Sequence, residues 1–194
     1  RELILPLIES SPEARYGSCP VAAPAWSPLG AAGPFLEGGD IFMCGDDARN
    51  VLVGVDEKRS SSASGVSWLA RFLAEDGYTV TPVPITPDAP THLLGVLGCV
   101  GPERALIYRP SLLNGVPDAV KNWDLIDLTL EETLNTAPCV TMLDEETVLM
   151  SDGTPRVAEE LSRRGLEVIT VPMDAVTFWD GGVRCCTFVM RRDR

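Results

Sequence analysis

The sequence has one histidine, no C-x-x-C pair and no apolar run that could cross a bilayer. One histidine and six scattered cysteines provide few suitably spaced ligands for a zinc site. The longest clearly apolar run, residues 93–100, is far short of the roughly 20 residues that a membrane helix needs. No charged start followed by an apolar stretch and a cleavage site is present. We therefore expect a cytoplasmic protein with no metal, cofactor or membrane partner.

Basic residues are also scarce. Lysine and arginine number 16 against 28 acidic residues, which gives a formal net charge of −12. Proteins that bind nucleic acids or anionic membranes need a basic face, so neither is an expected partner. An acidic surface instead favours a small cationic substrate through long-range steering.

The 194 residues suffice for a single catalytic domain, 1–194, with a core of its own. Residues 1–35 stand apart because they are rich in proline, and residues 21–34 add alanine and glycine. This composition is typical of a surface connection, and a lid over a pocket is the alternative.

From residue 36 onward, one order of elements repeats: strand, strand, helix, strand. The units are predicted at 36–85, 90–129 and 137–172, and residues 181–194 begin a fourth. Strands are predicted at 41–44, 51–55, 79–83, 93–99, 105–108, 125–128, 139–143, 147–150, 167–171 and 185–190.

Helices are predicted near 64–75 and after Thr154, where Pro155 occupies the first turn and Gly165 ends the helix. Residues 110–122 are a weak helix or an irregular link. Repeats of this length indicate radial or stacked units.

Three reactive residue types stand at unit starts: Glu37, His92 and Cys185. In a ring of units, equivalent positions face one axis, so these residues would meet in a central pocket. Taken alone, each has an ordinary explanation: a solvated turn acid, a structural histidine and a buried thiol. Cys185 and Cys186 are adjacent in a predicted strand, so one would face the pocket and the other the core.

The order Glu-Gly-Gly-Asp from Glu37, His-Leu from His92, and Gly-Gly-Val-Arg-Cys-Cys-Thr from Gly181 resembles the guanidino-group-modifying enzymes. These include dimethylargininase, arginine deiminase and the amidinotransferases. The resemblance runs from about Phe35 to Arg194. It implies the α/β pentein fold, a propeller of such units around a pseudosymmetry axis, here incomplete at the N-terminus.

The resemblance also implies roles. Cys185 matches the nucleophile, His92 the general acid and base, and Glu37 the carboxylate that binds the guanidinium and supports the histidine. Asp40, the second acid of the same turn, is counted among the substrate-binding candidates, with a structural role behind the reacting groups as the alternative, and Arg59 lies near a position that holds a substrate carboxylate. A thiolate is the protein nucleophile best suited to a guanidinium carbon, and the expected intermediate is a thiouronium on Cys185.

The chain departs from the family at two places. Leu94 stands where arginine deiminase and the amidinotransferases have aspartate. Dimethylargininase also lacks this aspartate, so the position resembles dimethylargininase. The upstream acidic motif is absent from residues 1–36. The chain begins at Arg1 and holds fewer than five units, so we expect a second chain or a second copy to complete the fold.

Three functions remain in competition. The first is a hydrolase of a C–N bond in an arginine-like guanidino or amidine compound. The second is an amidinotransferase that passes the amidino group to an amine, and both use one covalent intermediate. The third is a non-catalytic pentein that binds a partner.

Overall fold

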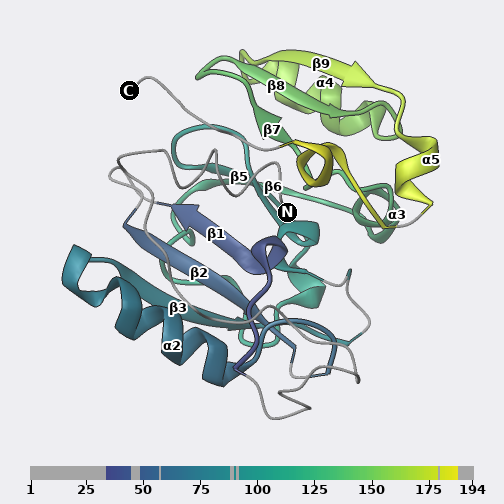
Figure 1. Ribbon diagram of the computed structural model, residues 1–194. Coiled ribbons are helices and arrows are strands. Elements are labelled where there is room, and N and C mark those ends of the chain that lie inside the picture. Colours follow the sequence, from purple (N-terminus) through teal and green to yellow (C-terminus); the bar gives the residue numbers. More distant parts are fainter. Residues whose placement is uncertain are drawn as a thin grey trace, which may run out of the picture.

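Three three-stranded sheets repeat one strand order along the chain (Figure 1). The computed structural model describes residues 34–44, 49–56, 58–87, 90, 92–178 and 180–187. The strands are β1 (Ile41–Cys44), β2 (Asn50–Val55), β3 (Thr79–Pro84), β4 (Leu97–Cys99), β5 (Arg104–Ile107), β6 (Asp124–Asp127), β7 (Thr141–Met142), β8 (Thr147–Ser151) and β9 (Glu167–Val171). In each sheet the first pair is antiparallel and the second parallel. The predicted repeat of strands is confirmed; the predicted linker or lid in residues 1–35 lies almost wholly outside the described residues.

Helices make the parallel crossover in the first and third units, as parallel pairing requires a long connection. Helix α2 (Ala63–Leu73) begins at Ser62, whose side chain accepts a hydrogen bond from Gly65 N, and continues as η3 (Ala74–Asp76) to Gly77. Helix α4 (Pro155–Arg163) starts at the predicted proline. Thr154 precedes it as predicted, but its side chain makes no capping bond.

The second unit crosses over without an α-helix. A single turn, η5 (Arg109–Ser111), and further turns connect β5 to β6, so the irregular link is the correct alternative for residues 110–122. Side chains alternate along β5: Ala105 and Ile107 join one core cluster while Leu106 joins another. Both faces of this sheet are therefore covered by the neighbouring units.

Each pair of consecutive units shares a hydrophobic core. The first core combines Phe42 and Leu52 of the first unit with Leu97 and Ile107 of the second. The second core combines Leu106 with residues of the third unit, among them Val148, Met150, Val157 and Leu161. A smaller cluster packs α2 against the first sheet. The contacts that join the units are thus as apolar as a domain interior.

Two short helices were not predicted. Helix α3 (Leu130–Leu134) carries a capping box in which Thr129 accepts from Glu132 N and the Glu132 carboxylate accepts from Thr129 N. The Thr-x-x-Glu pattern that marks such a start is present in the sequence. Helix α5 (Asp174–Thr177) is one turn long and leads into the last described segment.

Two predicted strands begin too early, because their first residues form turns. Residues 93–95 form a turn, η4 (Leu93–Gly95), because Gly95 N and Val96 N donate to the carbonyls of His92 and Leu93. Residues 183–186 form a similar turn, η6 (Val183–Cys186), closed by Cys185 N donating to Gly182 O. The remainder of the predicted strand 185–190 lies outside the described residues beyond Thr187.

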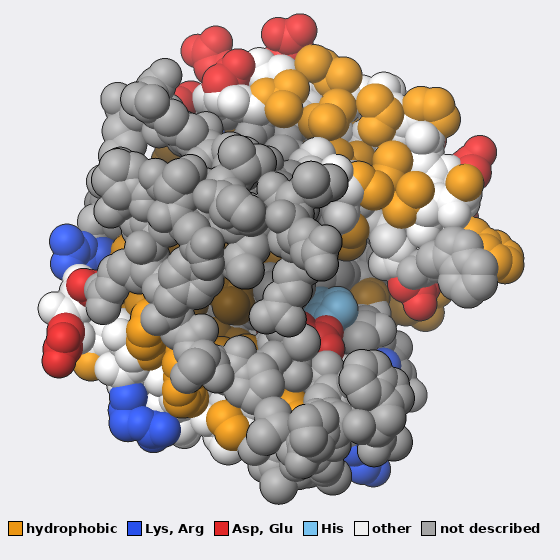
Figure 2. All heavy atoms as spheres, in the orientation of Figure 1, with side chains coloured by type: hydrophobic (Ala, Val, Ile, Leu, Met, Phe, Trp, Pro, Cys, Tyr) orange, Lys and Arg blue, Asp and Glu red, His pale blue; other side chains and the backbone are white. Residues whose placement is uncertain are grey.

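Apolar side chains gather on the surface of the third unit, at the top of Figure 2. Leu143 and Ile169 of this unit are 51% and 39% exposed. No helix in the described part of the chain is long and apolar enough to cross a membrane.

The segment that leads to Glu37 is held against the start of α2 by two hydrogen bonds. Phe35 N donates to Ser62 Oγ at 3.0 Å, and Ser62 N donates to Phe35 O at 3.0 Å. A Cβ on Gly65 would overlap the Phe35 carbonyl. Gly65→Ala should therefore lower the free energy of unfolding by about 1–3 kcal/mol, although alanine is favoured by about 1 kcal/mol in a helix.

Urea unfolding checks this result against Ser67→Ala, an exposed position in the same helix. The control should change stability by less than about 0.5 kcal/mol. A Gly65→Ala protein as stable as the control would contradict the close packing of Phe35 on the start of α2.

Candidate active site

Three turns at unit starts place the predicted catalytic residues. Glu37 immediately precedes η2 (Gly38–Asp40), and His92 immediately precedes η4; both are extended, with φ near −122° and −123°. Cys185 lies within η6. Glu37 and His92 thus occupy equivalent positions, as predicted, whereas Cys185 lies inside its turn and Gly182 takes the equivalent position there.

A buried carboxylate ties the first two of these turns together. Asp40 is fully buried, and its Oδ2 accepts from Ser61 N at 3.1 Å and Ser61 Oγ at 2.7 Å. Its Oδ1 accepts from Leu93 N at 3.0 Å. A Cβ at Gly54 would lie 2.5 Å from this oxygen, so glycine there leaves room for it. Asp40 therefore fixes the start of η4, and with it the backbone beside His92.

Glu37 and His92 are hydrogen-bonded to each other through Oε2 and Nε2. Glu37 N also donates to Ser61 Oγ at 2.9 Å, which secures the backbone beneath the carboxylate. A Cβ on Gly39 would lie 2.7 Å from the His92 ring, so the imidazole packs directly on the glycine backbone. Both side chains stay partly exposed, at 27% for Glu37 and 36% for His92.

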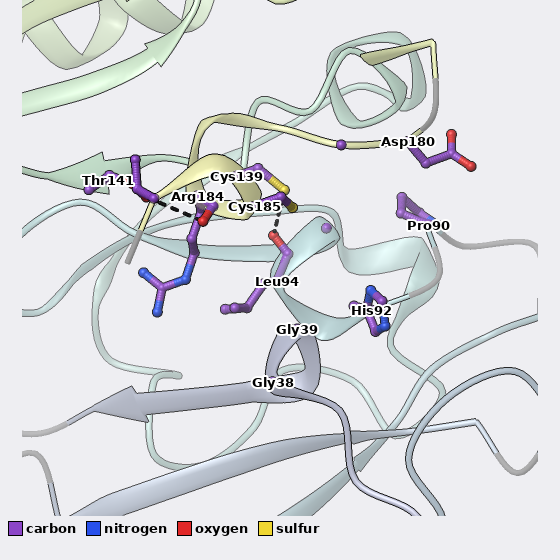
Figure 3. A pocket seen from close by; sticks show the side chains of 13 residues that line it. Gly38, Gly39, Pro90, His92, Leu94, Cys139, Thr141, Asp180, Arg184 and Cys185 are labelled. Carbon is purple, nitrogen blue, oxygen red and sulfur yellow. Dashed lines mark hydrogen bonds between the residues drawn. The ribbon is translucent and has the colours of Figure 1, made fainter. Parts of the chain in front are cut away.

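His92 and Cys185 line a common cavity of about 780 Å³. Figure 3 shows the cavity between the η2 and η4 turns and the segment that carries Asp180, Arg184 and Cys185. Its other lining residues are Gly38, Gly39, Pro90, Leu94, Gly95, Cys139, Thr141, Gly181 and Thr187. The cavity is thus lined by the glycine backbone of the first unit, by residues of the second and third units, and by the turn that follows them.

The surroundings of Cys185 favour its ionised form. A hydrogen bond from Cys139, opposed by partial burial and aided by the Gly182 backbone and the nearby His92, lowers the pKa of Cys185 to about 5. The same hydrogen bond, together with burial, raises the pKa of Cys139 well above its usual range. These shifts favour ionisation of Cys185 before Cys139.

Three predictions need correction. Asp40 was counted among the substrate-binding candidates, with a structural role as the alternative; the structural alternative is the correct one, because Asp40 is fully buried and both of its oxygens are engaged by Ser61 and Leu93. Arg59 Nε binds Asp56 at 2.5 Å, its Nη2 donates to Thr86 O, and it is not among the residues that line the cavity. Cys186 was expected to pack in the core, but in a turn, unlike a strand, it is exposed.

Cys139 is the cavity residue that the sequence analysis passed over. It follows Pro138, where the third unit was predicted to start, so the unit-start rule that selected Glu37 and His92 also points to it. Asp180 and Arg184 were likewise missed; they flank the two glycines before Cys185. Among the described residues, no group of three or more histidine, cysteine or acidic side chains could hold a metal ion.

No protein-family model matches the chain. An uncharacterized protein of Bacillus subtilis strain 168, YkgA, is 30% identical over 158 residues, which cover 81% of this chain and 52% of that protein. The chain therefore spans about half the length of this relative.

Solved structures of three guanidino-modifying enzymes are similar. The dimethylarginine dimethylaminohydrolase of Pseudomonas aeruginosa, complexed with citrulline, is 25% identical with a TM-score of 0.62, over 75% of this chain and 52% of that one. The N-terminal domain of the cyanobacterial arginine dihydrolase ArgZ is 16% identical with a TM-score of 0.67, over 77% of this chain and 54% of that domain. The amidinotransferase SxtG of Microseira wollei is 21% identical with a TM-score of 0.73, over 99% and 61%.

These similarities agree with the repeated units and with the placement of the predicted residues: His92 and Cys185 line one cavity, and Glu37 binds His92 but is not itself among the lining residues. The fold is pentein-like α/β, and the three sheets are small and separate. The chain belongs to the pentein superfamily of guanidino-group-modifying enzymes.

Proposed function

We propose that the protein is a cysteine-dependent hydrolase of a C–N bond in a small guanidino or amidine compound of the arginine type. The observation that carries the proposal is the placement of Cys185, with a pKa lowered to about 5, on the same cavity as a His92–Glu37 pair. A nucleophile, a proton carrier and a carboxylate that orients the carrier are the groups that covalent amidine chemistry needs.

In the first step, the Cys185 thiolate attacks the guanidinium carbon to form a C–S bond. His92 protonates the departing nitrogen, the C–N bond breaks, and a thiouronium remains on Cys185. The Glu37 carboxylate orients the imidazole and adds negative charge beside the planar cation.

In the second step, water attacks the thiouronium carbon while His92 accepts a proton. The C–S bond then breaks, the thiolate returns, and the product carries a carbonyl in place of the lost nitrogen. Solved structures of similar proteins support this route: ArgZ with a covalently bound reaction intermediate, and a cysteine-to-serine mutant of ArgZ with bound substrate.

Amidino transfer is the second candidate, because SxtG matches 99% of the chain with a TM-score of 0.73. In this reaction an amine, in place of water, would attack the same thiouronium. Leu94 lines the cavity at the position where arginine deiminase and the amidinotransferases have aspartate and dimethylargininase does not, and this favours hydrolysis of the dimethylargininase type.

We also infer that the units surround a common axis, as the shared cores between consecutive units indicate. The cavity would then lie on this axis, which explains how residues 148 positions apart in sequence, Glu37 and Cys185, serve one site.

Product analysis tests the reaction class. The purified protein is incubated with arginine or N-methylated arginines, with and without glycine as acceptor amine, and the products are separated by mass spectrometry. We expect a ureido product and the released amine in both samples. An amidino-glycine product formed only with acceptor would show transfer, and an unchanged substrate in both would point to the non-catalytic alternative.

Replacing the nucleophile should abolish turnover. Cys185→Ser removes the thiolate, and a serine hydroxyl is not ionised at neutral pH, so kcat should fall at least about 1,000-fold. Cys186→Ser should keep most of the activity, because Cys186 is exposed and does not line the cavity. The reverse pattern would identify Cys186 as the nucleophile.

His92→Asn should stall the reaction, since the chain contains no other imidazole. General acid and base catalysis contributes about 100- to 10,000-fold, so turnover should drop by that factor. Mass spectrometry of the peptide that contains Cys185 shows where the reaction stalls: an adduct accumulates if its hydrolysis is blocked, and no adduct is found if its formation is blocked. Glu37→Gln provides the matched comparison, and its loss of turnover should be smaller because the imidazole remains. Unaltered turnover in His92→Asn would refute the role of His92 as the proton carrier.

A further inference from the structure

Three consecutive buried serines, Ser60, Ser61 and Ser62, lie between β2 and α2. The Ser60 hydroxyl has no hydrogen-bond partner in the described part of the protein. Ser62 Oγ accepts from Phe35 N at 3.0 Å and from Gly65 N at 3.1 Å, so it caps the helix. Ser61 is instead bonded to both acids of the Glu-Gly-Gly-Asp turn. The three neighbours thus have three separate environments, and that of Ser61 belongs to the candidate site.

The direction of both hydrogen bonds at the Ser61 hydroxyl is fixed. Its Oγ donates to Asp40 Oδ2 at 2.7 Å and accepts from Glu37 N at 2.9 Å. A serine hydroxyl has one proton and two lone pairs, a carboxylate accepts, and a backbone N–H can only donate. The proton therefore points to Asp40 and a lone pair points to Glu37. A side chain without a hydroxyl could not serve both partners.

These bonds link Ser61 to both members of the Glu37–His92 pair. Through Glu37 N, Ser61 holds the backbone of the residue whose carboxylate binds the imidazole. Through Asp40, whose Oδ1 accepts from Leu93 N at 3.0 Å, it is connected to the residue that follows His92. The contacts form a closed ring, because Glu37 and His92 are bonded to each other at its far side. Hydrogen bonds connected in this way strengthen one another in a buried setting.

Ser61 is itself held in place by backbone contacts. Asp56 N donates to Ser61 O at 3.1 Å, and Ser60 N donates to Asp56 O at 3.0 Å. The Asp56 carboxylate also binds Arg59 Nε at 2.5 Å. On the other side, Ser62 begins α2. Ser61 therefore lies between a closed turn and a helix start, and a residue fixed in this way can determine where its partners lie.

We propose that Ser61 is a positioning residue of the candidate site, whose hydroxyl aligns the Glu37 carboxylate with His92 by joining the Glu37 backbone to Asp40. Ser61 is fully buried and is not among the residues that line the cavity, so it acts through Glu37 and Asp40 and not on substrate. The alignment is a property of the protein without substrate. Its consequence for turnover rests on the proposed function.

Nuclear magnetic resonance of the imidazole tests the alignment directly. The chain has one histidine, so the ring nitrogens of His92 give one set of signals. Ser61→Ala leaves Glu37 N without this acceptor, so the Nε2 signal should move toward its position in Glu37→Gln, measured at the same pH. Ser60→Ala is the matched control and should leave the signal unchanged, because the Ser60 hydroxyl has no partner among the described residues. An unmoved signal in folded Ser61→Ala, or an equal displacement in Ser60→Ala, would overturn the proposal.

Hydrogen exchange in the unaltered protein covers the case in which Ser61→Ala does not fold. The amides of Glu37 and Leu93 both donate into the ring of contacts around Ser61 and Asp40. Both should exchange at least about 100-fold more slowly than in an unfolded chain, and low urea should accelerate both equally because they open together. A Glu37 amide that exchanges as fast as in an unfolded chain would contradict the proposal.

Turnover separates this inference from the proposed reaction. If the protein is the proposed hydrolase, misalignment of the pair in Ser61→Ala should lower kcat by up to about 100-fold, with KM changed less than kcat. Ser60→Ala should keep the activity of the unaltered protein. A displaced Nε2 signal in a protein without turnover would leave the inference intact while removing the proposed reaction. Turnover with the same kcat and the same signal in Ser61→Ala would do the reverse.

Discussion

The carboxylate of Asp40 holds the two halves of the catalytic pair in register. A buried charge is stable only where hydrogen bonds compensate it, and Asp40 receives three, two from Ser61 and one from Leu93. The last of these is the bond that connects the first unit to the start of η4. Without it, Leu93 N would lose its partner and His92 would no longer be aligned with Glu37. The same aspartate that a family resemblance assigns to substrate thus acts one step behind the reacting groups.

Groups on two sides of the cavity determine the electrostatics of the site. Glu37 and His92 come from turns fixed by Asp40, and they supply a proton carrier beside a negative charge. Cys185 comes from a separate turn, where Cys139 and the Gly182 backbone favour the thiolate. A cationic substrate placed between them meets negative charge on both sides, in agreement with the acidic character of the whole chain.

Local patterns predicted much of the fold and part of the site. Alternating apolar residues located the strands, and Pro155 with Gly165 located α4 to the residue. The starts at Leu93 and Cys185 were mistaken for strands because their turns depend on contacts distant in sequence, such as Asp40 with Leu93. Cys139 was missed for a related reason: a cysteine in an apolar stretch is ordinarily a core residue, and only its neighbours in space distinguish it. Arg59 could be placed near a family position but not oriented, because its partner Asp56 competes for the guanidinium.

The shared hydrophobic cores make the site sensitive to partial opening. His92 belongs to the second unit, and the second core holds that unit against the third, which carries Cys139. Proteins open in cooperative segments at free energies below that of global unfolding. If the third unit separated in this way, each sheet could keep its own strand pairing, while Cys185, whose turn is bonded to the third unit through Arg184 N and the Cys139 carbonyl, moved away from His92. Cys185 and His92 would part before the chain unfolds, so any activity that needs both side chains reports on whether the units are closed on each other.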